Sequence, residues 1–161
     1  RAARELPAEE IFVMDSGMAA ILGASLDVGA AGKQRVLTLD LATSHTVGAV
    51  LEEGKISGFF EYHTEGLKRP RLEELVKDLA DGNLTHSQIL SEGGHGAYTR
   101  RAPGFSAIER IVVTGPRRGI LEEIQPPWML GAPFGDNMMT GTVGVLEAIR
   151  RRKGLSGLPL L

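Results

Sequence analysis

Three apolar segments of strand length follow one another with only short turns between them. They are residues 36–41, 46–51 and 56–62. Glu53-Gly54 is a typical turn dipeptide between the second and third segments, because glycine readily adopts the positive φ that a tight hairpin needs. Segments joined so closely pair as neighbours, so the sequence predicts a three-stranded meander.

Helical patterns and further strand-like segments flank this meander on both sides. Helices are expected at 15–27, 72–79, 85–90 and 136–152, strands at 11–14, 111–114 and 128–130, and a glycine-rich loop at 91–105. This order predicts an α/β fold in which the meander and two parallel strands form a mixed five-stranded sheet flanked by helices.

Composition narrows the function classes. The 161 residues include 42% hydrophobic and 24% charged residues, and the net charge is −2, which favours one soluble domain without affinity for nucleic acid or membranes. No segment has the apolar length of a membrane span or the pattern of a signal peptide, so a cytoplasmic protein is expected. The chain has no cysteine, which excludes disulfides and thiolate metal sites within it.

The first candidate site follows the strand at 36–41. Asp40 stands at the strand end, and Thr43, Ser44, His45 and Thr46 follow it. Hydroxyls and backbone N–H groups in such a turn can hold phosphate oxygens, and the carboxylate can hold Mg²⁺ directly or through water. The alternative is an aspartate that only hydrogen-bonds its own turn.

The second candidate site follows the strand at 111–114. Gly115 ends the strand, Pro116 suits the first position of a helix, and Arg117 and Arg118 come next. A helix N-terminus attracts anions, and glycine allows a ligand to approach the backbone. An ordinary strand-to-helix turn is the alternative.

Two helices carry faces of small residues. These residues are Gly17, Ala20 and Ala24 in the first helix and Gly141, Gly144 and Ala148 in the last. Glycine in a helix costs about 1 kcal/mol relative to alanine, so a compensating contact is expected. The pattern predicts that these two helices cross closely.

The glycine-rich loop supplies a third candidate site. Glu92, His95 and Tyr98 could bind a metal or small molecule, although a mobile surface loop is the simpler interpretation. The other histidines, His45, His63 and His86, show no metal-ligand spacing.

In their order, these features resemble the second half of the superfamily of actin, sugar kinases and heat-shock ATPases, which has a ribonuclease H-like fold. The resemblance identifies a first connecting helix at 15–27, a phosphate hairpin at 36–52, an adenosine-type turn at 111–119 and a second connecting helix at 136–152. It implies a single C-terminal lobe over 1–154 with a loose tail at 155–161, cut from a longer protein.

The resemblance also implies a nucleotide site. It implies that Asp40 is the catalytic acidic residue and organises Mg²⁺, that Thr43, Ser44, His45 and Thr46 line the phosphates of ATP, and that Gly115, Arg117 and Arg118 flank the nucleoside. The activity would be that of an ATPase or phosphotransferase completed by the missing N-terminal lobe. Segment 11–14 would have lost its sheet and would pair with another copy of the chain or fold back.

Two positions depart from the superfamily pattern. Ala42 and Pro116 stand where glycine is usual, which leaves a non-catalytic scaffold or sensor as the alternative function. More narrowly, the chain resembles a family labelled pyruvate formate-lyase activating enzyme. Such an enzyme needs three cysteines for an iron–sulfur cluster, so the absence of cysteine argues against that activity in this chain.

Overall fold

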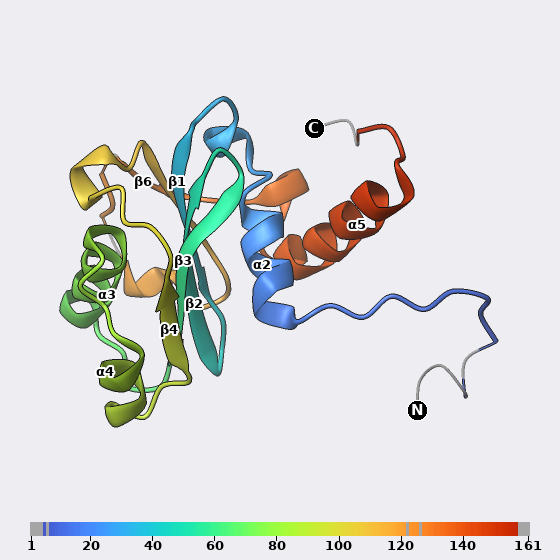
Figure 1. Ribbon diagram of the computed structural model, residues 1–161. Helices are drawn as coiled ribbons and strands as arrows, with labels where there is room; N and C mark the ends of the chain where they lie inside the picture. The colour runs from blue at the N-terminus through green and yellow to red at the C-terminus, as the bar shows by residue number, and fades with distance from the viewer. Residues whose placement is uncertain (1–4, 6, 122, 126, 158–161) are drawn as a thin grey trace.

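The computed structural model describes residues 5, 7–121, 123–125 and 127–157. A six-stranded mixed sheet lies at its centre, with α3 and α4 on one face and α2 and α5 on the other (Figure 1). The strands are β1 (Arg35–Leu41), β2 (His45–Glu52), β3 (Lys55–His63), β4 (Gly96–Thr99), β5 (Arg110–Thr114) and β6 (Trp128–Leu130). The α-helices are α2 (Ser16–Ala24), α3 (Arg69–Asp81), α4 (His86–Ser91) and α5 (Thr140–Lys153).

The strand order is β4-β3-β2-β1-β5-β6. Strands β1 to β4 pair antiparallel, whereas β5 runs parallel to β1 and β6 runs parallel to β5. The meander and the two parallel strands therefore form the predicted ribonuclease H-like arrangement. The predicted count of five strands was wrong, because β4 forms within the segment expected to be loop and pairs with the edge of β3.

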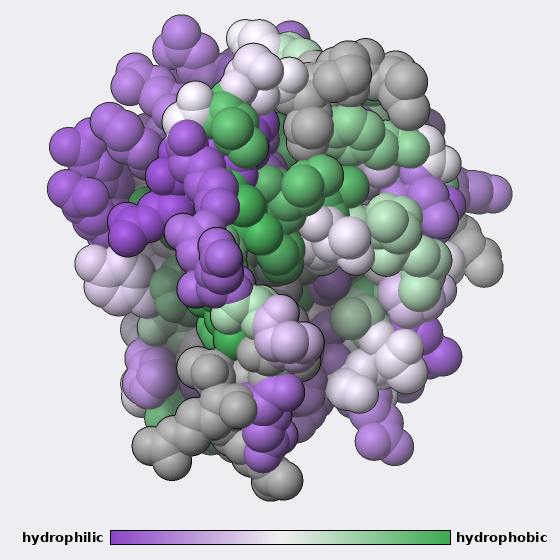
Figure 2. Space-filling view, turned by 90° about the vertical axis from the view of Figure 1, so that its right-hand side faces the viewer, coloured by the Kyte–Doolittle hydropathy of each residue, from purple (hydrophilic) through white to green (hydrophobic). Residues whose placement is uncertain are grey.

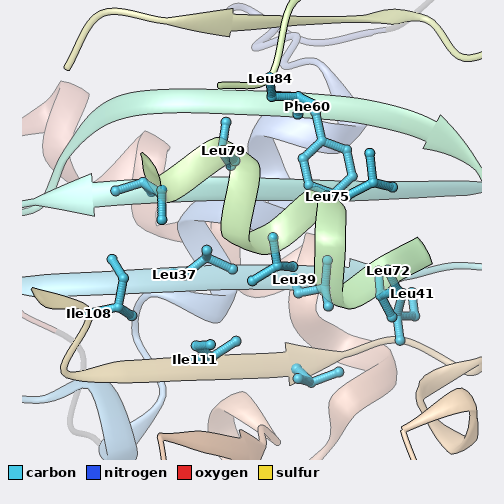
Figure 3. Packing of buried hydrophobic residues seen from close by; sticks show 14 of the residues in the cluster. Leu37, Leu39, Leu41, Phe60, Leu72, Leu75, Leu79, Leu84, Ile108 and Ile111 are labelled. Carbon is cyan, nitrogen blue, oxygen red and sulfur yellow. The ribbon is translucent and has the colours of Figure 1, made fainter. Parts of the chain in front are cut away.

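The main core lies between the sheet and α3. Leu72, Leu75 and Leu79 recur at helical spacing on α3 and point toward the leucines of β1 (Figure 3). Phe60 of β3 fills the same layer, and Gly48 makes room for it, because a Cβ there would lie 2.4 Å from Cε1 of the Phe60 ring. Burial of these side chains provides most of the hydrophobic stabilisation of this face.

The two helices on the opposite face cross at glycines. Asp15 caps α2 by accepting a hydrogen bond from the Met18 N–H at 2.9 Å. A Cβ at Gly23 would lie 1.8 Å from the Thr140 carbonyl oxygen, and one at Gly144 would lie 1.8 Å from the Ala19 carbonyl oxygen. The helices thus cross closely, but the glycine at the crossing on α2 is Gly23, which is not one of the predicted face residues Gly17, Ala20 and Ala24.

The predicted strand at 11–14 is absent. Residues 11–14 precede α2 as an extended segment that pairs with no strand of the described part of the molecule (Figure 1). Phe12 is 40% exposed and Val13 is 88% exposed. An apolar sequence favours a strand, but a strand also needs a neighbour for its backbone hydrogen bonds.

Helix α5 begins later than predicted. Asp136 caps a short 3₁₀ turn, Asn137–Met139, by accepting a hydrogen bond from the Met138 N–H, and α5 proper starts at Thr140. Gly154 ends the helix with a φ of 64°. Residues 155–157 of the predicted tail are exposed, and 158–161 lie outside the described residues.

Hydrophobic side chains gather on the surface beside α5. Phe12, Val13 and Met14 line an apolar groove together with Val145, Ala148, Ile149 and Arg152 of α5. The view toward this side of the molecule shows hydrophobic atoms near its centre (Figure 2). None of the helices among the described residues has the length and hydrophobicity to cross a membrane.

Candidate functional site

The C-terminal ends of β1 and β5 lie side by side. Asp40 of β1 is in register with Thr114 of β5, and the Thr114 hydroxyl donates a hydrogen bond of 2.8 Å to Asp40 Oδ1. Burial raises the pKa of Asp40, while the hydrogen bond from Thr114 opposes the rise. An ionised Asp40 therefore gains more from a nearby cation than an exposed aspartate does.

The turn after β5 packs directly on the end of β1. Gly115 has a φ of 91°, and a Cβ on it would lie 2.4 Å from the Leu41 carbonyl oxygen. The same oxygen accepts a hydrogen bond of 2.9 Å from the Arg117 N–H. The two candidate segments, which are far apart in the sequence, thus meet through their backbones, and only glycine suits this position.

A cleft of about 280 Å³ opens between the hairpin and the N-terminus of α2. Its lining includes Asp40, Thr43, Ser44 and His45. Ala42, noted in the sequence as a departure from the superfamily pattern, also lines it, and the sequence prediction had missed the remaining lining residues, which are Asp15, Ser16, Gly17, Val47 and Glu61. Asp40 and three of the four predicted hairpin residues therefore share one cleft.

Thr46 does not reach this cleft. It is 0% exposed, and its hydroxyl pairs with that of Thr64 at 2.9 Å. Successive side chains of a strand point to opposite faces, so Thr46 points away from the face that carries His45 and Val47. Its placement contradicts the expected role at the phosphates.

The two arginines after Gly115 have different surroundings. Arg117 is exposed, whereas Arg118 Nη1 donates a hydrogen bond of 2.9 Å to the Gly131 carbonyl oxygen. The Asn137 amide satisfies both Gly115 and Arg118 at 3.3 Å when its nitrogen faces the Gly115 carbonyl and its oxygen faces Arg118 Nη2. Arg118 is thus held to the turn that precedes α5.

The helix expected after Pro116 is only one 3₁₀ turn, Arg118–Ile120. The expected helix after Pro116 was therefore wrong, and so short an element has little dipole to attract an anion. Gly115 instead serves to bring the backbone of this turn against β1.

The glycine-rich loop does not form one site. Glu92 accepts hydrogen bonds from Arg71 and from the Tyr62 hydroxyl. Tyr98 is exposed, and its ring packs 6.1 Å from that of Phe59. The predicted grouping of Glu92 and Tyr98 with His95 is therefore not what the structure shows.

His95 joins two other histidines instead. One nitrogen of each of His45, His63 and His95 lies within 4.8 Å of the others. His45 and His63 are opposite each other in the β2–β3 pairing. The sequence prediction missed this cluster because the histidines are far apart in the chain, and only the strand register could have placed the first two together.

The cleft has the oxygen donors that Mg²⁺ prefers. They are the Asp40 carboxylate and the hydroxyls of Thr43 and Ser44. The raised pKa of Asp40 is consistent with a carboxylate that a cation would stabilise in its ionised form. These three residues therefore fit a magnesium-bound phosphate.

Comparison with known proteins gives a family and a distant structural match. No curated protein matches the chain in sequence. A crystal structure of the apo psk41 parM protein is similar at 13% identity with a TM-score of 0.39, over 86% of this chain and 49% of that one. The chain thus spans about half the length of that structure.

The family match covers residues 1–120. The family model is described as "Putative pyruvate format-lyase activating enzyme (DUF1786)". Because the match extends over most of the sequence, this chain belongs to that family.

Proposed function

We propose that this chain is the nucleotide-binding lobe of an ATP-dependent protein and holds the phosphates of Mg-ATP at the β1–β2 hairpin. The observation that carries the proposal is the meeting of Asp40 and Gly115 at one edge of the sheet, beside a cleft lined by Thr43 and Ser44. In open α/β sheets, ligands bind outside the carboxyl ends of parallel strands.

In this proposal, hairpin residues contact the phosphates and the magnesium ion, and residues at the end of β5 and in the turn after it support the site. The hydroxyls of Thr43 and Ser44 donate to phosphate oxygens, and Asp40 holds the magnesium ion. When bound, that ion neutralises phosphate charge. Thr114 keeps Asp40 in place through its hydrogen bond. Arg117, which is exposed, is free to lie against the nucleoside.

Ala42 is compatible with this role. It keeps a negative φ in the hairpin loop, so the loop does not depend on glycine at this position. The Ala42 methyl lies in the lining of the cleft, where it limits how closely a phosphate can approach the backbone.

A non-catalytic scaffold or sensor is the second candidate function. The single 3₁₀ turn after Pro116 favours it, because no helix N-terminus faces a nucleotide there. The binding of Arg118 to Gly131 also occupies a guanidinium that could otherwise contact a nucleotide. In either function the lobe works with a second lobe that closes the cleft.

Calorimetric titration with Mg-ATP tests the proposal on the full-length protein that contains this chain. We expect saturable binding that weakens at least tenfold in Asp40→Asn. Asp78→Asn is the matched control, because Asp78 lies on α3 at the other face of the sheet, and its affinity should equal that of the wild type.

ATP turnover, measured beside affinity, separates the two candidate functions. Binding with ATP turnover that is lost in Asp40→Asn supports an enzyme, and binding without turnover supports a sensor. Absence of Mg-ATP binding, or equal affinity in wild type and Asp40→Asn, would contradict the nucleotide proposal.

A further inference from the structure

Three imidazole rings meet where β2 begins, β3 ends and β4 is about to begin. The ring centroids of His45 and His63 are 5.1 Å apart, those of His45 and His95 are 4.6 Å apart, and those of His63 and His95 are 5.0 Å apart. The rings therefore form a nearly equilateral triangle. Three of the four histidines of the chain belong to it.

The sheet places these side chains by backbone geometry. His45 and His63 are opposed in the antiparallel β2–β3 pair. The His95 N–H donates a hydrogen bond of 3.0 Å to the Glu61 carbonyl oxygen, which fixes the third histidine beside the end of β3. His45 and His63 belong to paired strands, and the backbone of His95 is hydrogen-bonded to β3, so the three backbones are pre-arranged.

The spacing suits one metal ion. The ligating nitrogens lie within 4.8 Å of one another, and a tetrahedral zinc with Zn–N bonds of about 2.1 Å holds its nitrogens about 3.4 Å apart. His63 and His95 are exposed, so rotation of their side chains can close the remaining distance. Three imidazoles leave the fourth position of a tetrahedral ion open.

The ligand type selects the class of metal. Neutral imidazole suits zinc and other divalent transition ions, whereas Mg²⁺ prefers oxygen ligands. Glu61 Oε1 lies 4.0 Å from His95 Nδ1, close to where a carboxylate orients a metal-bound histidine through its second nitrogen. The donor set is thus distinct from that of Asp40, Thr43 and Ser44.

We propose that His45, His63 and His95 bind one divalent transition-metal ion of the zinc class. His45 and Glu61 also line the cleft beside the hairpin, so the ion occupies the margin of that cleft. Binding of the ion ties the start of β2 and the end of β3 to the residue before β4 and restrains the edge of the cleft.

Zinc titration of the untagged 161-residue chain tests this site without any nucleotide. After removal of metal by a chelator, the chain is titrated with Zn²⁺ against a chromophoric competitor. One tight site per chain is expected, and His63→Ala and His95→Ala should each weaken it at least tenfold. His86→Ala is the matched control, because His86 lies outside the cluster, and its affinity should be unchanged.

Thermal unfolding shows whether the variants keep the fold. In metal-free buffer, His95→Ala should unfold at the wild-type temperature, because its side chain is 48% exposed. Adding Zn²⁺ should raise the unfolding temperature of the wild type and of His86→Ala but not of His95→Ala. Absence of stoichiometric binding, or an equal loss of affinity in His86→Ala, would overturn the proposal.

Discussion

Asp40 combines partial burial with a position at the cleft. Burial raises the pKa of its carboxyl group above the value in the unfolded chain, and the Thr114 hydroxyl only partly opposes this. The folded state therefore binds the proton more tightly than the unfolded state. This carboxyl favours folding when protonated, and the favourable contribution is lost as pH rises from the unfolded pKa through the folded one.

Replacing Asp40 with asparagine should separate stability from binding. Asp40→Asn is neutral at every pH, so we expect a higher unfolding temperature than the wild type at about pH 7 and little difference at about pH 3. Thermal denaturation at the two pH values measures both. A variant less stable than the wild type at neutral pH would contradict this expectation. It would mean that the ionised carboxylate stabilises the fold even without a cation.

At the scale of elements, α2 and α5 cross at close range on one face of the sheet. Backbone meets backbone there, because Gly23 and Gly144 have no side chains. Glycines lower the intrinsic stability of both helices, and the close approach offsets that loss through packing. The crossing therefore sets how α5 lies against α2.

Alanine at the crossing should separate the two helices. Gly144→Ala places a Cβ 1.8 Å from the Ala19 carbonyl oxygen, and we expect it to lower the free energy of unfolding by about 3 kcal/mol. Gly141→Ala is the control on the same helix, because its Cβ would meet no atom within 4 Å. It should raise stability by about 0.5 kcal/mol. Urea denaturation measures both, and equal effects at the two positions would contradict the close crossing.

The same elements show what local sequence patterns can and cannot predict. The meander and α3 were predictable, because short turns and helical spacing act over a few residues. β4 was not, because a four-residue strand beginning with glycine depends on the edge of β3. The approach of His95 to His45 and the direction of Thr46 depend on strand register, which the apolar pattern alone left open.

At the scale of the whole molecule, the groove between segment 11–14 and α5 exposes apolar side chains, including Phe12 and Val13. We expect the isolated chain to self-associate through this groove, because burial of exposed apolar surface favours association. Sedimentation over a range of concentrations should show a monomer–dimer equilibrium.

A substitution in the groove and a control outside it test whether this groove is the surface of self-association. Val13→Asp should shift the chain to monomer, whereas Val28→Asp, at an exposed valine outside the groove, should leave the equilibrium unchanged. A wild-type chain that stays monomeric at all concentrations would contradict the expected self-association.

A further hollow lies at the opposite end of the sheet from the hairpin cleft. Its lining includes the basic residues Arg35, Lys55, Arg100 and Arg101 and the acidic residues Glu52 and Glu53. Its positive side chains could also attract the phosphates of a nucleotide by charge alone. We expect Mg-ATP to bind at the hairpin cleft rather than at this hollow.

Amide chemical-shift mapping of the ¹⁵N-labelled protein during titration with Mg-ATP distinguishes these two binding sites. We predict that the largest shifts occur at Thr43, Ser44 and Gly115 and disappear in Asp40→Asn. Shifts centred on Arg100 and Arg101, or unchanged amides at the hairpin, would contradict it.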